Sequence, residues 1–178
     1  KVDYILVDAE KKIISKNKKA IVNIEKSAKN SIKKSEIFTY KGNDLTVQAA
    51  DTFINDYFIK DIRGIGGKKI LILGAGNIGF KLGLKMVENG GNVYLYRRSK
   101  KILNNIIRSI NFIKPKGTEA TAKKLNRIDN NLKDFDIIFG CTDGKSILTK
   151  NHVEKFKKDV VILDIGKGIL QKNALKLA

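Results

Sequence analysis

From Lys68 to its end, the chain alternates short apolar runs with segments of helical periodicity. Aliphatic runs bounded by glycine or polar residues predict buried strands over 68–73, 92–97, 135–140 and 159–166. The run 117–122 predicts a further, exposed strand. Apolar residues at helical spacing predict helices over 77–89, from Ser99 to the residue before Pro115, and over about 150–156. Strands that alternate with helices predict a doubly wound parallel sheet with helices on both faces, which is an α/β fold.

The first 63 residues follow a different pattern. They predict a β-hairpin over 2–15, a very basic helix over 20–34, a strand over 36–40 and a helix over 45–59. The stretch KDIRGIGGKK that follows is a natural hinge. We therefore expect a small α/β segment, residues 1–63, that belongs to a catalytic or oligomerisation region. A second domain would comprise residues 64–178.

Two of the predicted helices have a well-defined apolar face. The face of the helix over 45–59 consists of Ala49, Ala50, Phe53, Ile54, Tyr57 and Phe58. The face of the helix that begins after Ser99 consists of Ile102, Leu103, Ile106, Ile107, Ile110 and Ile113. Such faces predict burial against a core.

Composition narrows the class of protein. The hydrophobic content of 42% is enough for a core, but no apolar run approaches the ~20 residues of a membrane span, so we expect no membrane partner. The single cysteine, Cys141, excludes an internal disulfide and favours a reducing, cytoplasmic location. Because Lys1 is not an initiator methionine and no signal-peptide pattern follows it, we expect a fragment or a processed chain.

The formal net charge of +18 has two interpretations. One is an electrostatic surface for nucleic acid or another polyanion. However, only five of the 36 basic residues are Arg, and the Lys residues are spread along the whole chain. Nucleic-acid binders usually cluster Arg and interleave aromatic residues, and the chain has neither an RNP-like nor a zinc-ligand pattern. A lysine-rich solvated surface is the better interpretation, and nucleic acid is not the expected partner.

The stretch ILILGAGNIGF, residues 70–80, places three glycines directly after an aliphatic strand. Gly74 would allow a tight turn, Gly76 would let the backbone approach a pyrophosphate, and Gly79 would let the following helix pack closely on the strand. The N–H groups at the start of that helix, at Asn77 and Ile78, would face the phosphates. A glycine-rich turn that binds nothing is the alternative. The strand–turn–helix context favours a dinucleotide site.

The end of the next strand bears on which dinucleotide is bound. NAD sites place Asp or Glu there to bind the ribose 2′-hydroxyl, whereas this chain has Arg97, Arg98 and Ser99. A guanidinium pairs with a 2′-phosphate, and a hydroxyl adds a donor. Surface arginines of a basic protein are the alternative interpretation. The position at the strand end favours NADP over NAD as the cofactor.

Residues 70–101 resemble the NAD(P)-binding Rossmann domain of shikimate dehydrogenases and glutamyl-tRNA reductases. In those families an Asn-Arg-Thr-like element holds NADP, and Arg97, Arg98 and Ser99 match it. Residues 135–168 are similar to the corresponding part of those families and of methylene-tetrahydrofolate dehydrogenases. The resemblance, which covers about residues 41–170, implies that the loop containing Thr142 and the residue Gly166 lie near the nicotinamide.

The resemblance leaves the catalytic residues unidentified. Shikimate dehydrogenases carry an Asn-Thr-Asp-Gly motif from which residues 42–46 depart, so Asp44 is better explained as a helix N-cap. No lysine matches the catalytic one of that family. Cys141 favours inert packing over a nucleophile, and His152 favours a surface role over acid–base catalysis. No ligand cluster supports a metal site.

The sequence therefore predicts an NADP-dependent dehydrogenase or reductase that acts on a small oxo or hydroxy substrate. The alternative is a dinucleotide-binding sensor or structural module without hydride transfer. Residues 1–63 are too few to enclose a small substrate, so we expect a missing N-terminal half or a partner subunit, such as a second copy, to complete the site.

Overall fold

The structure is a computed structural model that describes residues 2–10, 12–14, 21–129, 131–144 and 146–177. It forms two compact units, Lys1–Thr46 and Val47–Ala178. The sequence predicted a domain boundary after residue 63, whereas the two units meet between Thr46 and Val47. No helix among the described residues is long and apolar enough to span a membrane.

The first unit is built around two parallel strands, β1 (Tyr4–Asp8) and β4 (Glu36–Tyr40). A separate antiparallel pair, β2 (Lys12–Ile14) and β3 (Ile21–Asn23), precedes helix α1 (Ile24–Ser31). The strand predicted over 36–40 is confirmed. The hairpin predicted over 2–15 is wrong, because β1 pairs in parallel with β4 instead of folding back onto β2; residues 11 and 15 lie outside the described residues.

Helix α1 is shorter than the basic helix predicted over 20–34. Residues 21–23 form β3, and residue 20 lies outside the described residues. The helix begins after Asn23, whose side chain accepts a hydrogen bond from the N–H of Lys26 at 3.1 Å. An asparagine cap of this kind favours a helix start, and here it separates strand from helix.

Helix α2 (Gly42–Tyr57) begins three residues earlier than predicted. The N–H of Gly42 donates to Asp8 Oδ1 at 3.2 Å, and the N–H of Asn43 donates to Glu10 Oε2 at 2.7 Å. Asp44 therefore lies within the first turn, and its prediction as the N-cap is wrong. Carboxylates more than thirty residues away along the chain accept from the N–H groups that a local cap would otherwise satisfy.

The second half of α2 packs in the second unit. Ala50 and Ile54 are buried and Phe58 is half-buried, but the predicted face is only partly correct, because Ala49, Phe53 and Tyr57 are exposed. The buried carboxylate of Asp51 accepts hydrogen bonds from the side-chain amides of Asn55 and Asn89, both at 2.8 Å. Asn89 follows helix α3 (Asn77–Glu88), so this contact joins the second half of α2 to the end of α3.

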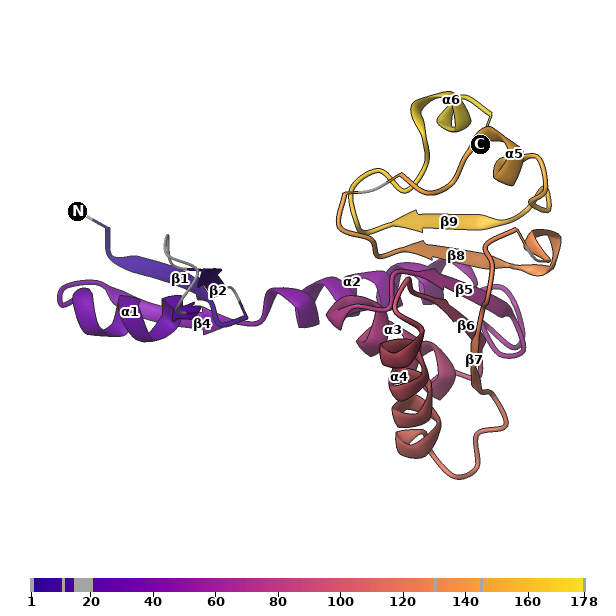
Figure 1. Ribbon diagram of the computed structural model, residues 1–178. Helices are drawn as coiled ribbons and strands as arrows, with labels where there is room; N and C mark the ends of the chain where they lie inside the picture. The colour runs from indigo at the N-terminus through magenta and orange to yellow at the C-terminus, as the bar shows by residue number, and fades with distance from the viewer. Residues whose placement is uncertain (1, 11, 15–20, 130, 145, 178) are drawn as a thin grey trace. The chain divides into compact units, whose positions relative to one another are not determined.

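The second unit contains a parallel sheet of five strands in the order β7-β6-β5-β8-β9 (Figure 1). The strands are β5 (Lys69–Leu73), β6 (Asn92–Tyr96), β7 (Ala122–Lys124), β8 (Ile137–Gly140) and β9 (Val161–Asp164). The chain starts in the middle, runs outward to one edge through β6 and β7, and returns to build the other side. This order, with β5 and β8 adjacent, is that of a Rossmann fold, so the predicted α/β class is confirmed.

The remaining elements connect these strands, except for the last helix, which follows β9. They are α3 (Asn77–Glu88), α4 (Lys100–Ile113), the 3₁₀ turn η1 (Leu132–Asp134), α5 (Lys150–Val153) and α6 (Lys172–Leu175). Strands form in all four predicted runs, within shorter bounds. Strands β5 and β8 are buried along most of their length, whereas β6 alternates between buried and half-buried residues and β9 is half-buried with Asp164 exposed. The exposed strand predicted over 117–122 instead forms at 122–124, where pairing with β6 supplies its hydrogen bonds.

The core has one cluster on each face of the sheet. On one face Ile70 and Ile72 of β5 pack with Leu82 and Met86 of α3 and with α4. On the other face Leu71 and Leu73 pack with residues of the connecting segments, including Leu132, Phe135, Leu148 and Ile169. Of the predicted α4 face, Leu103 and Ile110 are buried, Ile106 and Ile107 are half-buried, and Ile102 and Ile113 are exposed. Successive residues of β5 thus face opposite sides of the sheet. Because both sides are covered, the strand is apolar at every position from Ile70 to Leu73.

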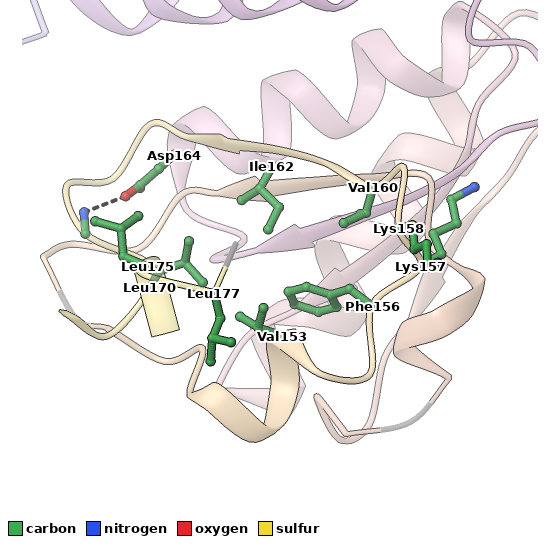
Figure 2. A pocket seen from close by; sticks show the side chains of 11 residues that line it. Val153, Phe156, Lys157, Lys158, Val160, Ile162, Asp164, Leu170, Leu175 and Leu177 are labelled. Atoms are coloured by element: carbon green, nitrogen blue, oxygen red, sulfur yellow. Dashed lines mark hydrogen bonds between the residues drawn. The ribbon is translucent and has the colours of Figure 1, made fainter. Parts of the chain in front are cut away.

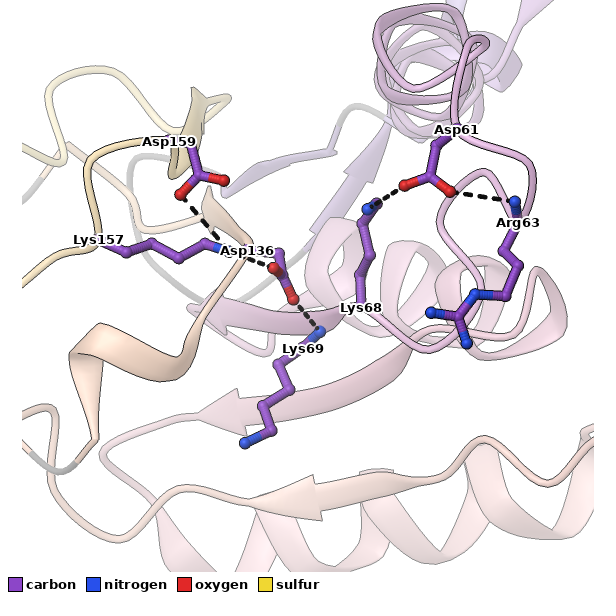
Figure 3. Close-up of polar contacts among 7 residues, drawn as sticks. All are labelled: Asp61, Arg63, Lys68, Lys69, Asp136, Lys157 and Asp159. Atoms are coloured by element: carbon purple, nitrogen blue, oxygen red, sulfur yellow. Dashed lines mark hydrogen bonds and ion pairs between the residues drawn. The ribbon is translucent and has the colours of Figure 1, made fainter.

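Asp136, just before β8, connects three segments at the amino-terminal edge of the sheet (Figure 3). Its Oδ2 accepts the N–H of Lys69 at 2.7 Å, and its Oδ1 pairs with Nζ of Lys157. This hydrogen bond with Asp136 raises the pKa of the Lys157 amine above its ordinary value. Nearby, Lys68 hydrogen-bonds to Asp61 at 2.7 Å and lowers the pKa of that carboxyl.

We predict that Asp136→Ala lowers the free energy of unfolding in urea by about 1–2 kcal/mol, because the Lys69 amide loses its acceptor and Lys157 loses its partner. The matched control is Asp159→Ala, since Asp159 lies 3.7 Å from the same lysine but its side chain is 82% exposed. We expect that control to change stability by less than about 0.5 kcal/mol. Equal losses in the two variants would contradict the prediction.

Candidate functional site

The turn after β5 requires a glycine at its first position. Gly74 has φ +105°, and a Cβ there would lie 2.5 Å from the carbonyl oxygen of Cys141 in the loop after β8. Both the positive φ and the backbone contact exclude a side chain. Gly74 therefore allows the loops of two adjacent strands to meet at the carboxyl-terminal edge of the sheet.

Gly79 and Gly76 lie on either side of the start of α3 and differ sharply in their surroundings. A Cβ on Gly79 would lie 2.1 Å from the carbonyl oxygen of Gly74, so the absence of a side chain lets α3 pack directly on the turn. A Cβ on Gly76 would meet no atom of the described residues within 4 Å. Gly76 and Asn77 are exposed and Ile78 is half-buried. The turn thus presents an open stretch of backbone at a helix N-terminus, which is a geometry that suits an anion.

The basic residues at the end of β6 do not share one environment. Arg97 is half-buried, and its Nη1 donates a hydrogen bond to the carbonyl oxygen of Ala75 in the glycine turn. Arg98 and Ser99 are exposed, and Ser99 is the N-cap residue of α4. The structure therefore brings the end of β6 against the glycine turn, with Arg97 directed to the turn itself.

The loops after β8 and β9 lie against each other beside the glycine turn. A Cβ on Gly166 would lie 2.1 Å from the carbonyl oxygen of Thr142, and the N–H of Gly144 lies 3.0 Å from the carbonyl oxygens of both Thr142 and Gly166. The N–H of Cys141 bonds to the carbonyl oxygen of Leu73 at 2.7 Å. The predicted residues Thr142 and Gly166 are therefore neighbours, and the loop that carries Thr142 contacts Gly74.

Asp164 organises the loop after β9 and was missed by sequence reasoning. Its carboxylate accepts the N–H groups of Gly166 at 3.1 Å, Gly168 at 2.6 Å and Ile169 at 2.8 Å. Lys167, between two of these residues, has φ +70°. An Asp two residues before a glycine is a recognised turn signal, and it could have identified this residue.

Cys141 and His152 have structural environments. Burial, together with the nearby Asp164 carboxylate, raises the pKa of the Cys141 thiol to about 12. His152 Nδ1 accepts the N–H of Thr149 at 2.9 Å in a capping box, and its Nε2 lies 3.0 Å from Asp129 Oδ1. The thiol is protonated at neutral pH, and the imidazole joins the start of α5 to a loop. Neither arrangement is that of an activated catalytic group.

The described residues contain no group of three or more His, Cys, Asp and Glu side chains placed to hold a metal ion. They do contain a pocket of about 590 Å³ along β9 (Figure 2). Its lining is mostly apolar, with Val153, Phe156, Ile162 and Leu170 among the side chains that point into it. The glycine turn after β5 does not line this pocket, whereas Asp164 and Gly168, on either side of Gly166 in the loop after β9, do.

Comparison with known proteins agrees with this geometry. The family model of shikimate / quinate 5-dehydrogenase matches residues 59–168. The glycerol-3-phosphate dehydrogenase (NAD(P)+) of Clostridium botulinum (strain Alaska E43 / Type E3) is 25% identical over 115 residues, which are 62% of this chain and 35% of that protein. The enzyme of the same name from Clostridium perfringens (strain SM101 / Type A) is 28% identical over the same shares. The chain thus spans about a third of the length of these curated relatives.

Solved structures share the fold at low sequence identity. The dipicolinate synthase A chain of Bacillus subtilis is 17% identical with a TM-score of 0.53, over 98% of this chain and 53% of that one. The apo D-lactate dehydrogenase of Escherichia coli is 12% identical with a TM-score of 0.54, over 98% and 56%. The family match assigns residues 59–168 to an NAD(P)-binding oxidoreductase family, which confirms the resemblance drawn from the sequence.

We predict that Gly79→Ala lowers the free energy of unfolding by about 1–3 kcal/mol, since its Cβ would overlap the Gly74 carbonyl. Alanine is ordinarily the better helix former by roughly 1 kcal/mol, so a loss would show that the contact dominates. The control is Gly76→Ala, whose Cβ points into open space; we expect it to stay within about 1 kcal/mol of wild type in the same urea titration. A stabilised Gly79→Ala variant would refute the packing argument.

A second prediction concerns Cys141. With its pKa near 12 instead of the ordinary 9.0, the folded thiol at pH 8 carries about a thousandth of the thiolate of an unfolded chain. Iodoacetamide should therefore modify the native protein very slowly and the urea-unfolded protein quickly, as followed by mass spectrometry. Because the thiolate is disfavoured in the folded state, this residue should also lower stability as pH rises above 9.0. Equal labelling rates would contradict the raised pKa of this thiol.

Proposed function

The chain belongs to the shikimate / quinate 5-dehydrogenase family. On that premise we propose that it binds NADP(H) and forms part of an oxidoreductase that acts on a small oxo or hydroxy substrate. The observation that carries the proposal is the open backbone of the glycine turn. At Gly74 and Gly79, neighbouring backbone atoms occupy the space that a Cβ would take. At Gly76, no described atom lies within 4 Å of that position. A pyrophosphate requires that free approach.

The residues around the turn fit the parts of a dinucleotide. Gly74, Gly76 and Gly79, with the backbone of Asn77 and Ile78, would hold the pyrophosphate at the N-terminus of α3. Thr142 and Gly166 would lie near the nicotinamide, at the carboxyl-terminal edge of the sheet. There β5 and β8 are neighbours, and the chain leads from β5 toward one side of the sheet and from β8 toward the other. When bound, the nicotinamide supplies the hydride donor or acceptor. The protein supplies position and shields the reacting atoms from water.

The preference for NADP over NAD rests on the end of β6. Arg98 and Ser99 are exposed there, at the place where NAD sites carry a carboxylate. A guanidinium and a hydroxyl would stabilise a 2′-phosphate, which a carboxylate would repel. The curated relatives carry both cofactors in their name, NAD(P)+, which is compatible with either preference.

The substrate class follows from the family and the relatives. Shikimate, quinate and glycerol 3-phosphate, which their names mention, are small polar molecules with hydroxyl groups. We propose that such a substrate approaches the carboxyl-terminal edge of the sheet. A further part of the protein or a second subunit would complete its site. The unpaired cysteine favours the cytoplasm as its location.

The test is calorimetric titration with NADP+ and NAD+, followed by an assay of turnover on hydroxy and oxo acids. We expect binding to wild type and its loss in Gly76→Val, whose side chain would occupy the approach of the pyrophosphate. Unchanged affinity in that variant would overturn the assignment of the glycine turn. Binding without turnover, in the full-length protein as well, would instead favour a dinucleotide sensor.

The preference for NADP has its own variant. Losing one charge-assisted contact with a phosphate costs about 1.5–3 kcal/mol, so Arg98→Met should weaken NADP+ binding by roughly tenfold to a hundredfold and leave NAD+ binding nearly unchanged. Arg108→Met, which removes the same charge from the exposed surface of α4, is the control. If Arg98→Met and Arg108→Met behaved alike, Arg98 would be only a surface charge.

A further inference from the structure

We propose that Arg97 is a positioning residue that fixes the backbone of the glycine turn, and that it does not itself bind the 2′-phosphate. This inference rests on the proposed dinucleotide site and divides the adjacent arginines into two roles. Arg97 would act through the peptide group between Ala75 and Gly76 and so support either dinucleotide. Arg98 would supply the selectivity for NADP.

Hydrogen bonds join the end of β6 to the glycine turn. The N–H groups of Gly74 and Ala75 both donate to the carbonyl oxygen of Tyr96, at 3.0 and 3.3 Å. The N–H of Gly76 donates to the carbonyl oxygen of Gly74 at 3.0 Å. The carbonyl oxygen of Ala75 accepts from Arg97 Nη1. The end of β6 therefore bonds to the turn through both its backbone and a side chain.

The peptide group between Ala75 and Gly76 is the one that most needs such a contact. The peptide that joins Ala75 to Gly76 borders a glycine, and a side chain at Gly76 would meet no described atom within 4 Å. Glycine adds rotational freedom that packing does not remove here. The two hydrogen bonds at the opposite ends of this peptide, from Gly76 N–H and to Ala75 C=O, fix its orientation. Arg97 provides one of the two.

The two arginines differ in how far their side chains are exposed to solvent. Arg97 is half-buried and Ala75, whose oxygen it contacts, is fully buried. A charged donor forms a stronger hydrogen bond than a neutral one, particularly where water is excluded. Arg98 is exposed, so its guanidinium is accessible to a ligand. Arg97 is thus placed to support the turn, and Arg98 is placed to contact a phosphate.

The test combines dinucleotide affinity with amide exchange. Arg97→Met is compared with Arg98→Met, with the surface control Arg108→Met and with Arg97→Lys, which can still donate one hydrogen bond. NAD+ and NADP+ affinities are measured by calorimetry. Hydrogen exchange of the backbone amides at 74–76 is measured on each protein without ligand.

We expect Arg97→Met to weaken NAD+ and NADP+ by a similar factor, about tenfold or more, so that the ratio of the two affinities is kept. The same variant should exchange the amides at 74–76 at least several-fold faster, and Arg97→Lys should recover part of both effects. Arg98→Met should change the ratio and leave the exchange rates unaltered, and Arg108→Met should change neither.

Loss of NADP+ affinity alone in Arg97→Met would overturn the proposal, because Arg97 would then contact the phosphate. Unaltered exchange in that variant would also overturn it. If wild type bound neither dinucleotide, the proposed function would fail. The exchange rates alone would then still decide whether Arg97 fixes the turn.

Discussion

Direct packing of backbone on backbone, at the carboxyl-terminal edge of the sheet, is the constraint on which the candidate site depends. Gly79 lies against the carbonyl of Gly74, Gly74 lies against the loop of Cys141 and Thr142, and Thr142 lies against Gly166. A Cβ at any of these glycines would come within 2.1–2.5 Å of a backbone oxygen. This series of contacts joins α3 and the loops that follow β5, β8 and β9. The loops that would surround a dinucleotide are thereby fixed by the absence of side chains.

Within this arrangement, Gly76 has a different reason to be glycine. Its neighbours do not require the absence of a side chain, since a Cβ there would meet no described atom within 4 Å. In the proposed function, its small size would leave room for the pyrophosphate of a nicotinamide dinucleotide. In the proposed function, Gly76 would serve binding and Gly79 would serve stability. Likewise, Arg97 would support the turn and Arg98 would supply the selectivity for NADP.

The first unit shows where local reasoning reached its limit. Strand β4 was predictable from its own residues, but its partner was not, because β1 joins it in parallel across α1. The start of α2 was also misplaced, since Asp8 and Glu10 accept the N–H groups of its first residues. Periodicity and capping preferences describe neighbours along the chain. Contacts between residues more than thirty positions apart leave no local signal.

The sequence by itself determined the alternation of strands and helices, the parallel sheet and the glycine turn, because hydrophobic period and glycine spacing act over a few residues. It also located the residues at the strand ends, which the sheet then brought to one edge. Only the tertiary structure decided that Arg97 turns toward Ala75, that Asp164 organises the loop beside Thr142, and that Asp51 attaches α2 to α3. Each of these depends on which groups become neighbours in space, and a polar side chain adopts the conformation that satisfies its nearest partner.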